Sequence, residues 1–379
     1  MIEFVLLGAF GGIIAGLIPG IHTNLVAVMV ACAGFDAWFS CLFLASLASS
    51  RSIIDAVPTV FLGASSDVMS LHPAHRFLKK GFGLVGVRIL VSGALAGLIV
   101  SFLLAPFLFI VLPFLQNLVK PVLFWLLLGV VIFLVLREGA RAFVVFSISG
   151  VLGYISLSAV TEPLFPLLSG LFGASGLILS LFDGFDVPLQ KTASNPNIPI
   201  SRLSLFAILG VCLSGFLMLF PGLGPSQAAS LVRVKSKTRY LLLTGALGTV
   251  DVIISLVAFV SIGRARNGAV AVMEQLVGSF DISALIALIG ACCFSAGIAG
   301  LASVPISKWY SSIFDFVEYR FVALGVLFFL CVLSLTLSGL LGLLIFAVSA
   351  IVGLLAPLLG VSRSHAMGCL LVPTLLMLW

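Results

Sequence analysis

Charged residues are scarce in this chain. Asp, Glu, Lys and Arg together make up 8% of its 379 residues, whereas soluble domains carry about 25%. Apolar residues make up 61% of the chain, and the mean hydropathy is +1.33. Apolar runs long enough to cross a hydrocarbon core recur along the whole length. The composition excludes a sizeable soluble domain and predicts an all-α polytopic membrane protein of the cell membrane.

The chain also lacks the motifs of common membrane enzymes. No HExxH, GxSxG or Walker-type GxxxxGK[ST] sequence occurs, so nothing supports a protease, hydrolase or ATPase. The seven cysteines include no CxxC pair and lie in apolar segments, which does not fit a zinc or disulfide framework. His72 and His75 have a metal-like spacing, but they lie in a basic loop that we assign to lipid head groups. We therefore expect no enzyme activity, no metal site and no cofactor besides a coupling ion.

A Pro-Gly pair interrupts an apolar segment twice, about half a chain apart. Pro19-Gly20, the first break, lies in segment 2–33, and Pro221-Gly222, the second break, lies in segment 203–233. Proline removes a helical hydrogen bond, and freed backbone groups find no water in a bilayer. Each segment is too long for one span and too short for two, so we predict two re-entrant helical hairpins. Paired broken helices in two halves are the best sequence indication of a transporter binding site.

The two halves of the chain look like repeats of one unit. At a shift of 200 residues, Phe146 aligns with Phe346 and Gly153 with Gly353. The first repeat covers residues 1–182, the second covers 203–379, and a polar cytoplasmic linker, 183–202, joins them. We predict five crossing helices per half, besides the hairpin, at 40–63, 83–110, 119–136, 142–160 and 164–182, and at 240–263, 283–305, 321–336, 342–359 and 366–379.

Charge in the loops indicates that the second repeat is inverted. Loop 34–39 has no base and its counterpart 233–239 has four, whereas loop 72–80 has three bases and 272–280 has none. Five crossings per half would turn the second half over, and the positive-inside rule then places the basic loops in the cytoplasm and the N-terminus outside. The net charge of +6 therefore reflects orientation in the membrane, and we expect no nucleic-acid partner.

Arg51 lies midway along the predicted helix 40–63. A charge at that depth costs at least ~2.5–3.5 kcal/mol and is by default a functional-site hypothesis. Asp251 aligns with Arg51 at the 200-residue shift, and Asp55 lies one turn away. Two interpretations stay open. The first is a structural ion pair that holds the halves together. The second is a countercharge for an anionic substrate, with Asp251 or Asp55 taking a coupling cation or proton.

The breaks supply the second part of the predicted site. A helix that restarts inside the membrane points N–H groups and a positive dipole end into a cavity, which suits carboxylate or phosphate oxygens. A packing kink bridged by Ser or Thr hydroxyls is the alternative. The predicted substrate-binding residues are Gly20, His22, Thr23, Asn24, Ser49, Ser50, Arg51, Ser52, Gly222, Gly224, Ser226 and Gln227. The predicted ion-coupling residues are Asp251, Asp55 and Thr249.

At its two breaks the chain resembles the large permease subunit of the tripartite tricarboxylate transporters, in a compact, archaeal-type form. Leu17-Ile18-Pro19-Gly20 and Phe220-Pro221-Gly222-Leu223-Gly224 are similar to that family's two Pro-Gly signatures. The resemblance implies uptake of di- or tricarboxylates driven by Na⁺ or H⁺. It also implies a small membrane subunit and an extracytoplasmic binding protein. The chain departs from the family in its short length, which leaves the need for these subunits open, and in Arg51, where the family tends to have small residues.

We therefore predict a secondary active transporter for small organic anions, with most weight on di- and tricarboxylates, that uses alternating access between the two repeats. A polyprenyl-phosphate flippase is the first alternative, because a midplane arginine suits a phosphate equally well. An anion channel is the second alternative. Membrane lipid surrounds the chain, and the sequence leaves its oligomeric state, including a homo-oligomer, open.

Overall fold

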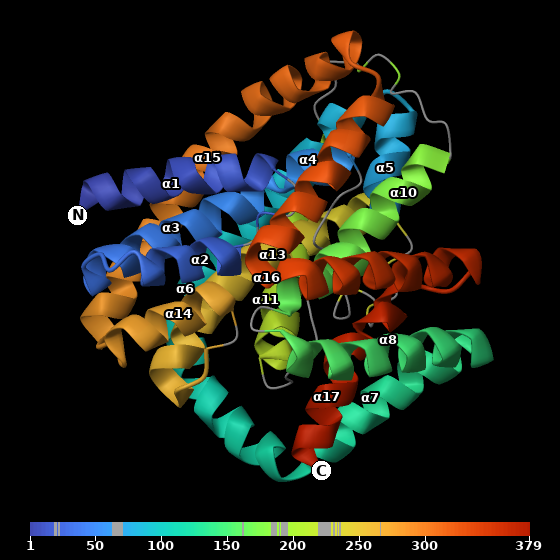
Figure 1. Ribbon diagram of the computed structural model, residues 1–379. Coiled ribbons are helices and arrows are strands. Elements are labelled where there is room, and N and C mark those ends of the chain that lie inside the picture. Colours follow the sequence, from blue (N-terminus) through green and yellow to red (C-terminus); the bar gives the residue numbers. More distant parts are fainter. Residues whose placement is uncertain are drawn as a thin grey trace.

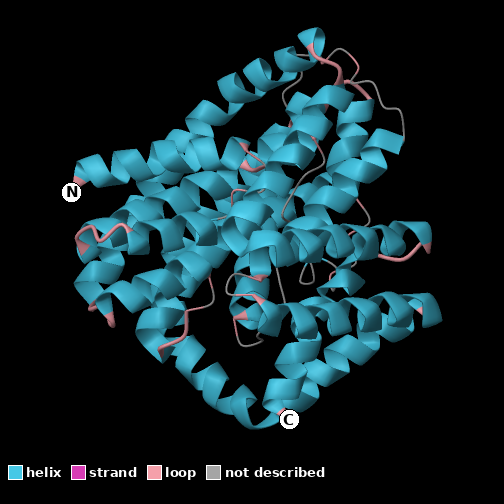
Figure 2. Cartoon of the chain, viewed as in Figure 1, coloured by secondary structure: helices cyan, strands magenta, loops and turns pink. Residues whose placement is uncertain are grey.

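The described part of the chain is built from helices and the loops that join them, and it contains no β-strand (Figure 2). This computed structural model describes all residues except 19, 20, 22, 63–70, 161, 162, 183–187, 189, 191–195, 219–228, 230, 231, 233, 235 and 266. Helices of the two halves lie side by side, and α13 is in the middle of the molecule (Figure 1).

The first half of the chain forms a series of apolar helices with short connections. Its elements are α1 (Ile2–Leu17), α2 (Thr23–Cys32), α3 (Ala37–Ile54), α4 (Ala56–Phe61), α5 (Leu71–Lys79), α6 (Gly83–Val119), η1 (Lys120–Val122), α7 (Leu123–Glu138), α8 (Ala140–Ala159), α9 (Leu164–Leu168), η2 (Ser169–Ala174) and α10 (Ser175–Phe182). The second half comprises α11 (Ile200–Leu217), α13 (Lys237–Ile262), α14 (Gly268–Val277), α15 (Ile282–Phe316), α16 (Tyr319–Leu358), η3 (Arg363–Met367) and α17 (Gly368–Leu378).

The order and lengths of the helices in the first half recur in the second. A short helix precedes a very long one in both, since α5 leads to the 37-residue α6 and α14 leads to the 35-residue α15. Gly139, between α7 and α8, has φ 81° and ψ −162°, and Gly339, inside α16, has φ 66° and ψ −165°. Side chains other than hydrogen rarely allow these angles. Both halves therefore bend at a glycine, 200 residues apart, and α16 changes direction there (Figure 1).

Helices occupy all ten predicted crossing segments, but several predicted bounds are wrong. The predicted helix 40–63 is interrupted at Asp55, because Pro58 has no N–H to donate to the carbonyl of the residue four positions earlier. The predicted helix 83–110 continues to Val119. The predicted linker is too long at its end, because α11 already begins at Ile200. The short helices α5 and α14 were not predicted.

The last helices of the two halves are exchanged. Helix α17 of the second half packs on α8 of the first, while η2 and α10 of the first half pack on α16 of the second. Gly153 of α8 lies against the backbone carbonyl of Cys369, and Gly353 of α16 lies against that of Leu171. A Cβ atom at either glycine would overlap the neighbouring backbone. Glycines 200 residues apart thus allow close helix contacts in both halves.

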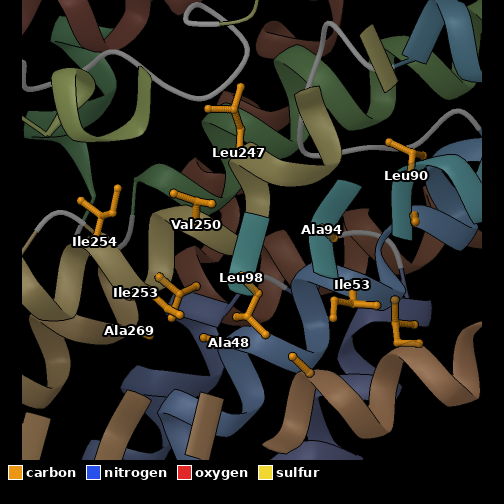
Figure 3. Close-up of a cluster of buried hydrophobic side chains, with 14 of the residues drawn as sticks. Ala48, Ile53, Leu90, Ala94, Leu98, Leu247, Val250, Ile253, Ile254 and Ala269 are labelled. Carbon is orange, nitrogen blue, oxygen red and sulfur yellow. The ribbon is translucent and has the colours of Figure 1, made fainter. Parts of the chain in front are cut away.

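The central core joins α3, α6, α13 and α14. Figure 3 shows Ala48 and Ile53 of α3, Leu98 of α6, Val250 of α13 and Ala269 of α14 in one buried cluster. The most apolar window of α13 is 83% buried, whereas that of the segment from α6 through α7 is 33% buried. Helix α13 is therefore an interior helix, and α3 and α6 contribute to the same core.

Large apolar side chains also cover the outside of the described part. Leu136 is 74% exposed, Leu301 84% and Ile110 74%. Soluble monomers rarely expose such continuous apolar surface. Seven helices of the described part are long and apolar enough to cross a membrane. The chain is a multi-pass membrane protein whose outer surface faces lipid.

Candidate functional site

The first break lies where the sequence places it. Helix α1 ends at Leu17, the following residue Ile18 has an extended backbone (φ −97°, ψ 107°), and α2 begins at Thr23. The Thr23 side chain is buried, with 5% of its surface exposed. The first N–H groups of a helix have no partner within it, so the start of α2 offers donors at the break.

Arg51 of α3 reaches this break. Its Nε donates a hydrogen bond to the carbonyl oxygen of Ile21 at 2.9 Å, across 30 residues of sequence. The side chain is 8% exposed. In the described residues this is the one hydrogen bond that the guanidinium makes, although it carries five N–H donors. Arg51 is therefore bonded to Ile21, one residue after the Pro19-Gly20 pair.

Three glycines set the position of Arg51 relative to the break. Gly8, Gly12 and Gly16 follow one another by about one turn on α1, and each lies against α3 so closely that a Cβ would collide with it. Small residues at this spacing let two membrane helices approach to backbone contact. Gly16 lies beside the backbone of Arg51 itself. The packing of α1 on α3 thus places the arginine next to the end of α1.

Neither predicted carboxylate pairs with Arg51 in the described residues. Among the described residues the one close contact between a carboxylate and a basic side chain lies elsewhere, where Oε2 of Glu138 is 3.1 Å from Nε2 of His365. Asp251 instead accepts a hydrogen bond from the side-chain amide of Asn267 at 3.2 Å. Within the described residues Arg51 therefore carries a positive charge without a carboxylate within 4 Å.

Ser49 and Thr249 use their hydroxyls to join the two halves. Ser49 of α3 donates to the carbonyl of Cys292 in α15 at 2.9 Å, and Thr249 of α13 donates to the carbonyl of Ala94 in α6 at 2.7 Å. Both side chains are fully buried. Each hydroxyl bonds to a neighbouring helix, and the roles of Ser49 in substrate binding and of Thr249 in ion coupling stay predictions.

Ser50 and Ser52 bond within their own helix. Ser50 Oγ donates to the carbonyl of Ser46 at 2.9 Å, and Ser52 Oγ donates to the carbonyl of Ser49 at 2.8 Å. Such hydroxyls keep lone pairs available and can reorient toward a ligand. Ser52 is half-buried, so it is the more accessible of the two.

Asn24 lies where α2 meets α14. The backbone of Gly268, the first residue of α14, is so close to the Asn24 side chain that a Cβ atom would overlap the amide. Helix α14 packs on both α2 and α3. Asn267, directly before Gly268, contacts Asp251. The structure therefore brings Asp251 to the helix that packs beside the first break.

Sequence reasoning missed Asn267, Gly268 and the carbonyl of Ile21. The available signal was an Asn directly followed by Gly, because Asn is a favoured N-cap. It was not used because no helix was predicted between the segments 240–263 and 283–305. Gly20, His22, Gly222, Gly224, Ser226 and Gln227 lie outside the described residues, and so does the second break. No group of three or more His, Cys, Asp or Glu residues that could hold a metal is found within the residues the structure describes.

These features define a multi-pass helical membrane protein in which a buried arginine side chain, that of Arg51, lies beside the break between α1 and α2. The chain belongs to the tripartite tricarboxylate transporter TctA family, whose profile matches residues 2–368. This is a family of membrane transporters. A relative from Methanocaldococcus jannaschii, described as "Uncharacterized protein MJ1079", is 24% identical over 399 residues, which cover 98% of each chain. No solved structure matches the chain.

Proposed function

We propose that this transporter is a secondary active permease for small organic anions of the di- and tricarboxylate class, driven by Na⁺ or H⁺. One observation carries the proposal: the hydrogen bond from Arg51 Nε to the carbonyl of Ile21 at the first break. This bond uses Nε, so the two terminal nitrogens of the guanidinium, Nη1 and Nη2, are left to bind a carboxylate. Arginine binds carboxylates in a bidentate manner, and the cost of burying its charge favours a functional role.

The substrate site would be completed by the starts of the helices that follow the two breaks. Around the first break, Thr23 and Asn24 would add hydrogen bonds, and Gly20 and His22 would lie beside them, with Ser50 and Ser52 on the facing helix. From the second break we propose Gly222, Gly224, Ser226 and Gln227. We propose the hydroxyls of Ser49 and Thr249 as links between the halves that border this site, because their hydrogen bonds cross between helices.

Alternating access would follow from an inverted duplication. Two observations support two repeats related by a pseudo-twofold axis. The backbone bends at a glycine in both halves, at Gly139 and Gly339, and the halves exchange the helices α17 and α10. In this arrangement the two broken segments are re-entrant hairpins that meet near the membrane centre, and one repeat element moves against the other. The N-terminus would be outside the cell.

Membership of a tripartite family supports a small membrane subunit and an extracytoplasmic binding protein as partners of this chain. We propose Asp251 as the ion-coupling residue, because its carboxylate accepts a hydrogen bond from Asn267 at the start of α14, the helix that packs on α2. Asp55, which separates α3 from α4, is the second candidate.

Uptake by the purified protein in liposomes tests this function. Radiolabelled citrate should accumulate against its gradient when an inward Na⁺ or proton gradient is imposed. Arg51→Gln should abolish uptake while the protein remains folded, and Lys120→Gln, at an exposed site in η1, should leave it unchanged. Wild-type uptake in Arg51→Gln would refute the role of Arg51. Stabilisation by a polyprenyl phosphate but not by citrate would instead indicate a lipid flippase.

A further inference from the structure

Asn267 makes four hydrogen bonds at the start of α14, and one of them is the helical bond that its carbonyl accepts from the N–H of Ala271 at 2.9 Å. Its side-chain Oδ1 accepts from the backbone N–H of Ala269 at 3.0 Å, and its backbone N–H donates to the hydroxyl of Ser255 at 2.9 Å. Its Nδ2 donates to Oδ2 of Asp251 at 3.2 Å. One residue therefore caps α14, attaches that helix to α13, and holds the carboxylate.

The cap determines which side of the amide faces Asp251. An asparagine amide has one acceptor and two donors, and a helix N-terminus requires the acceptor. With Oδ1 committed to Ala269, Nδ2 is the group that is left for the carboxylate. Asp251 Oδ2 is thus held by a fixed donor, and Oδ1 of Asp251 has no hydrogen-bond partner in the described residues.

The same end of α14 contacts the first break. Gly268 follows Asn267 directly and lies against the Asn24 amide with no room for a Cβ atom. Asn24 is three residues after Ile21, whose carbonyl holds Arg51. A movement of the start of α14 toward α2 would therefore displace Asn24 or be blocked by it. Figure 1 shows α14 directly beside α2.

We propose that Asn267 is a positioning residue that orients Asp251 to bind the coupling cation, and that the contact of Gly268 with Asn24 transmits cation binding to the anion site. This inference rests on the proposed function. A single carboxylate, without a cluster of three or more acidic or His/Cys residues in the described part, fits a monovalent cation or a proton. Calcium prefers several carboxylate and carbonyl ligands.

Two substitutions separate the contact with Asp251 from the cap. Asn267→Ser keeps a good N-cap acceptor but removes the amide donor, whereas Asn267→Ala removes both. The full-length protein in detergent is titrated with NaCl at constant ionic strength, with choline chloride making up the difference, and separately with acid in the absence of Na⁺. Thermal unfolding reports binding, because a bound cation stabilises the folded state.

In Asn267→Ser the cation concentration that gives half of the full stabilisation, the cation midpoint, should change by about tenfold, because one hydrogen bond to a charged group is lost. Its unfolding temperature without the cation should stay close to that of the wild type. Asn267→Ala should lower that temperature as well. If Asn267 served only as a cap, Asn267→Ser would instead keep the wild-type cation midpoint. That result, or the absence of any cation response in the wild type, would overturn the inference.

The transmission step is tested with a pair of glycines. Gly268→Ala places a methyl group on the Asn24 amide, whereas Gly248→Ala, on α13, enters open space. Gly268→Ala should reduce, by about tenfold, the factor by which the cation tightens citrate binding, and Gly248→Ala should leave that factor unchanged. Equal factors in both variants would contradict the transmission. A shifted cation midpoint in Asn267→Ser, with no citrate binding by the wild type, would reject the proposed substrate class and retain the cation site.

Discussion

Ser49 and Thr249, which are 200 residues apart, make the same hydrogen bond in the two halves of the protein. Each buried hydroxyl donates to a backbone carbonyl on the long helix of the opposite half, Ser49 to Cys292 and Thr249 to Ala94. The two bonds tie α3 to α15 and α13 to α6. Because they are equivalent, they provide a matched pair for measuring how the halves are joined.

Removing either hydroxyl should weaken the protein by a similar amount. Ser49→Ala and Thr249→Val each lose one interhelical hydrogen bond, which in membrane proteins contributes about 0.6–1.7 kcal/mol. Thermal or denaturant unfolding in detergent measures the loss. Ser158→Ala is the control, because that hydroxyl is exposed and bonds only within its own helix. A loss in one variant without the other would contradict the equivalence of the two bonds.

A methyl group at Gly153 or at Gly353 should separate the exchanged helices. The added Cβ would overlap the backbone carbonyl of Cys369 or of Leu171, and overpacking of this kind costs about 1–3 kcal/mol. Gly153→Ala and Gly353→Ala should both unfold at lower temperature and yield less folded protein. Gly129→Ala and Gly325→Ala have no atom within 4 Å of the new methyl group, so neither should lose stability, and the better helix propensity of alanine should add about 0.5–1 kcal/mol.

Glu138 should anchor the loop before α17. Its Oε2 accepts from the backbone N–H of Ser362 at 2.6 Å and lies 3.1 Å from Nε2 of His365, whose side chain is 3% exposed. Glu138→Ala should lower the free energy of unfolding by about 1–2 kcal/mol, since it removes a charge-assisted hydrogen bond. Glu138→Gln keeps an acceptor and should lose less. Glu3→Ala, at an exposed site in the first turn of α1, should have no effect. An unchanged unfolding temperature for Glu138→Ala would show that this contact does not hold the loop.

Site-directed labelling tests the inverted orientation. In a background without native cysteines, Phe35→Cys places a thiol in the loop before α3, and Lys237→Cys places one at the first residue of α13. A membrane-impermeant maleimide applied to intact cells should label Phe35→Cys, and it should label Lys237→Cys only after permeabilisation. Labelling of both from the same side would make the duplication parallel. That result would also remove the proposed meeting of the two breaks.

The membrane class, the first helix break and the buried arginine were predictable from the sequence, because each depends on local chemistry. Low charge and long apolar runs specify membrane helices whatever their neighbours are. Pro19-Gly20 interrupts a helix in any context, and helices α1 and α2 lie on either side of it. Arg51 stands out because a charge in a long apolar segment needs a reason.

Partners that are distant in sequence were not predictable. No periodic pattern indicates that Ser49 bonds to Cys292, 243 residues later. The serines near Arg51 were interpreted as ligands because small polar residues serve equally well in binding and in joining membrane helices. Helix α14 was missed because a ten-residue helix between two crossing segments has too few residues to show a period. Asn267 was missed for the same reason, since a capping residue is recognised only beside the helix that it caps.

The exchange of the last helices has a consequence for how the protein is made. The face of α8 that contains Gly153 receives its partner, α17, only after more than 200 further residues have been synthesised. At the usual speed of translation this takes roughly 10–40 s. During that time the polypeptide leaving the translocon holds an unfinished helix bundle in lipid. Insertion of α17 is therefore the step that commits the nascent chain to its final shape.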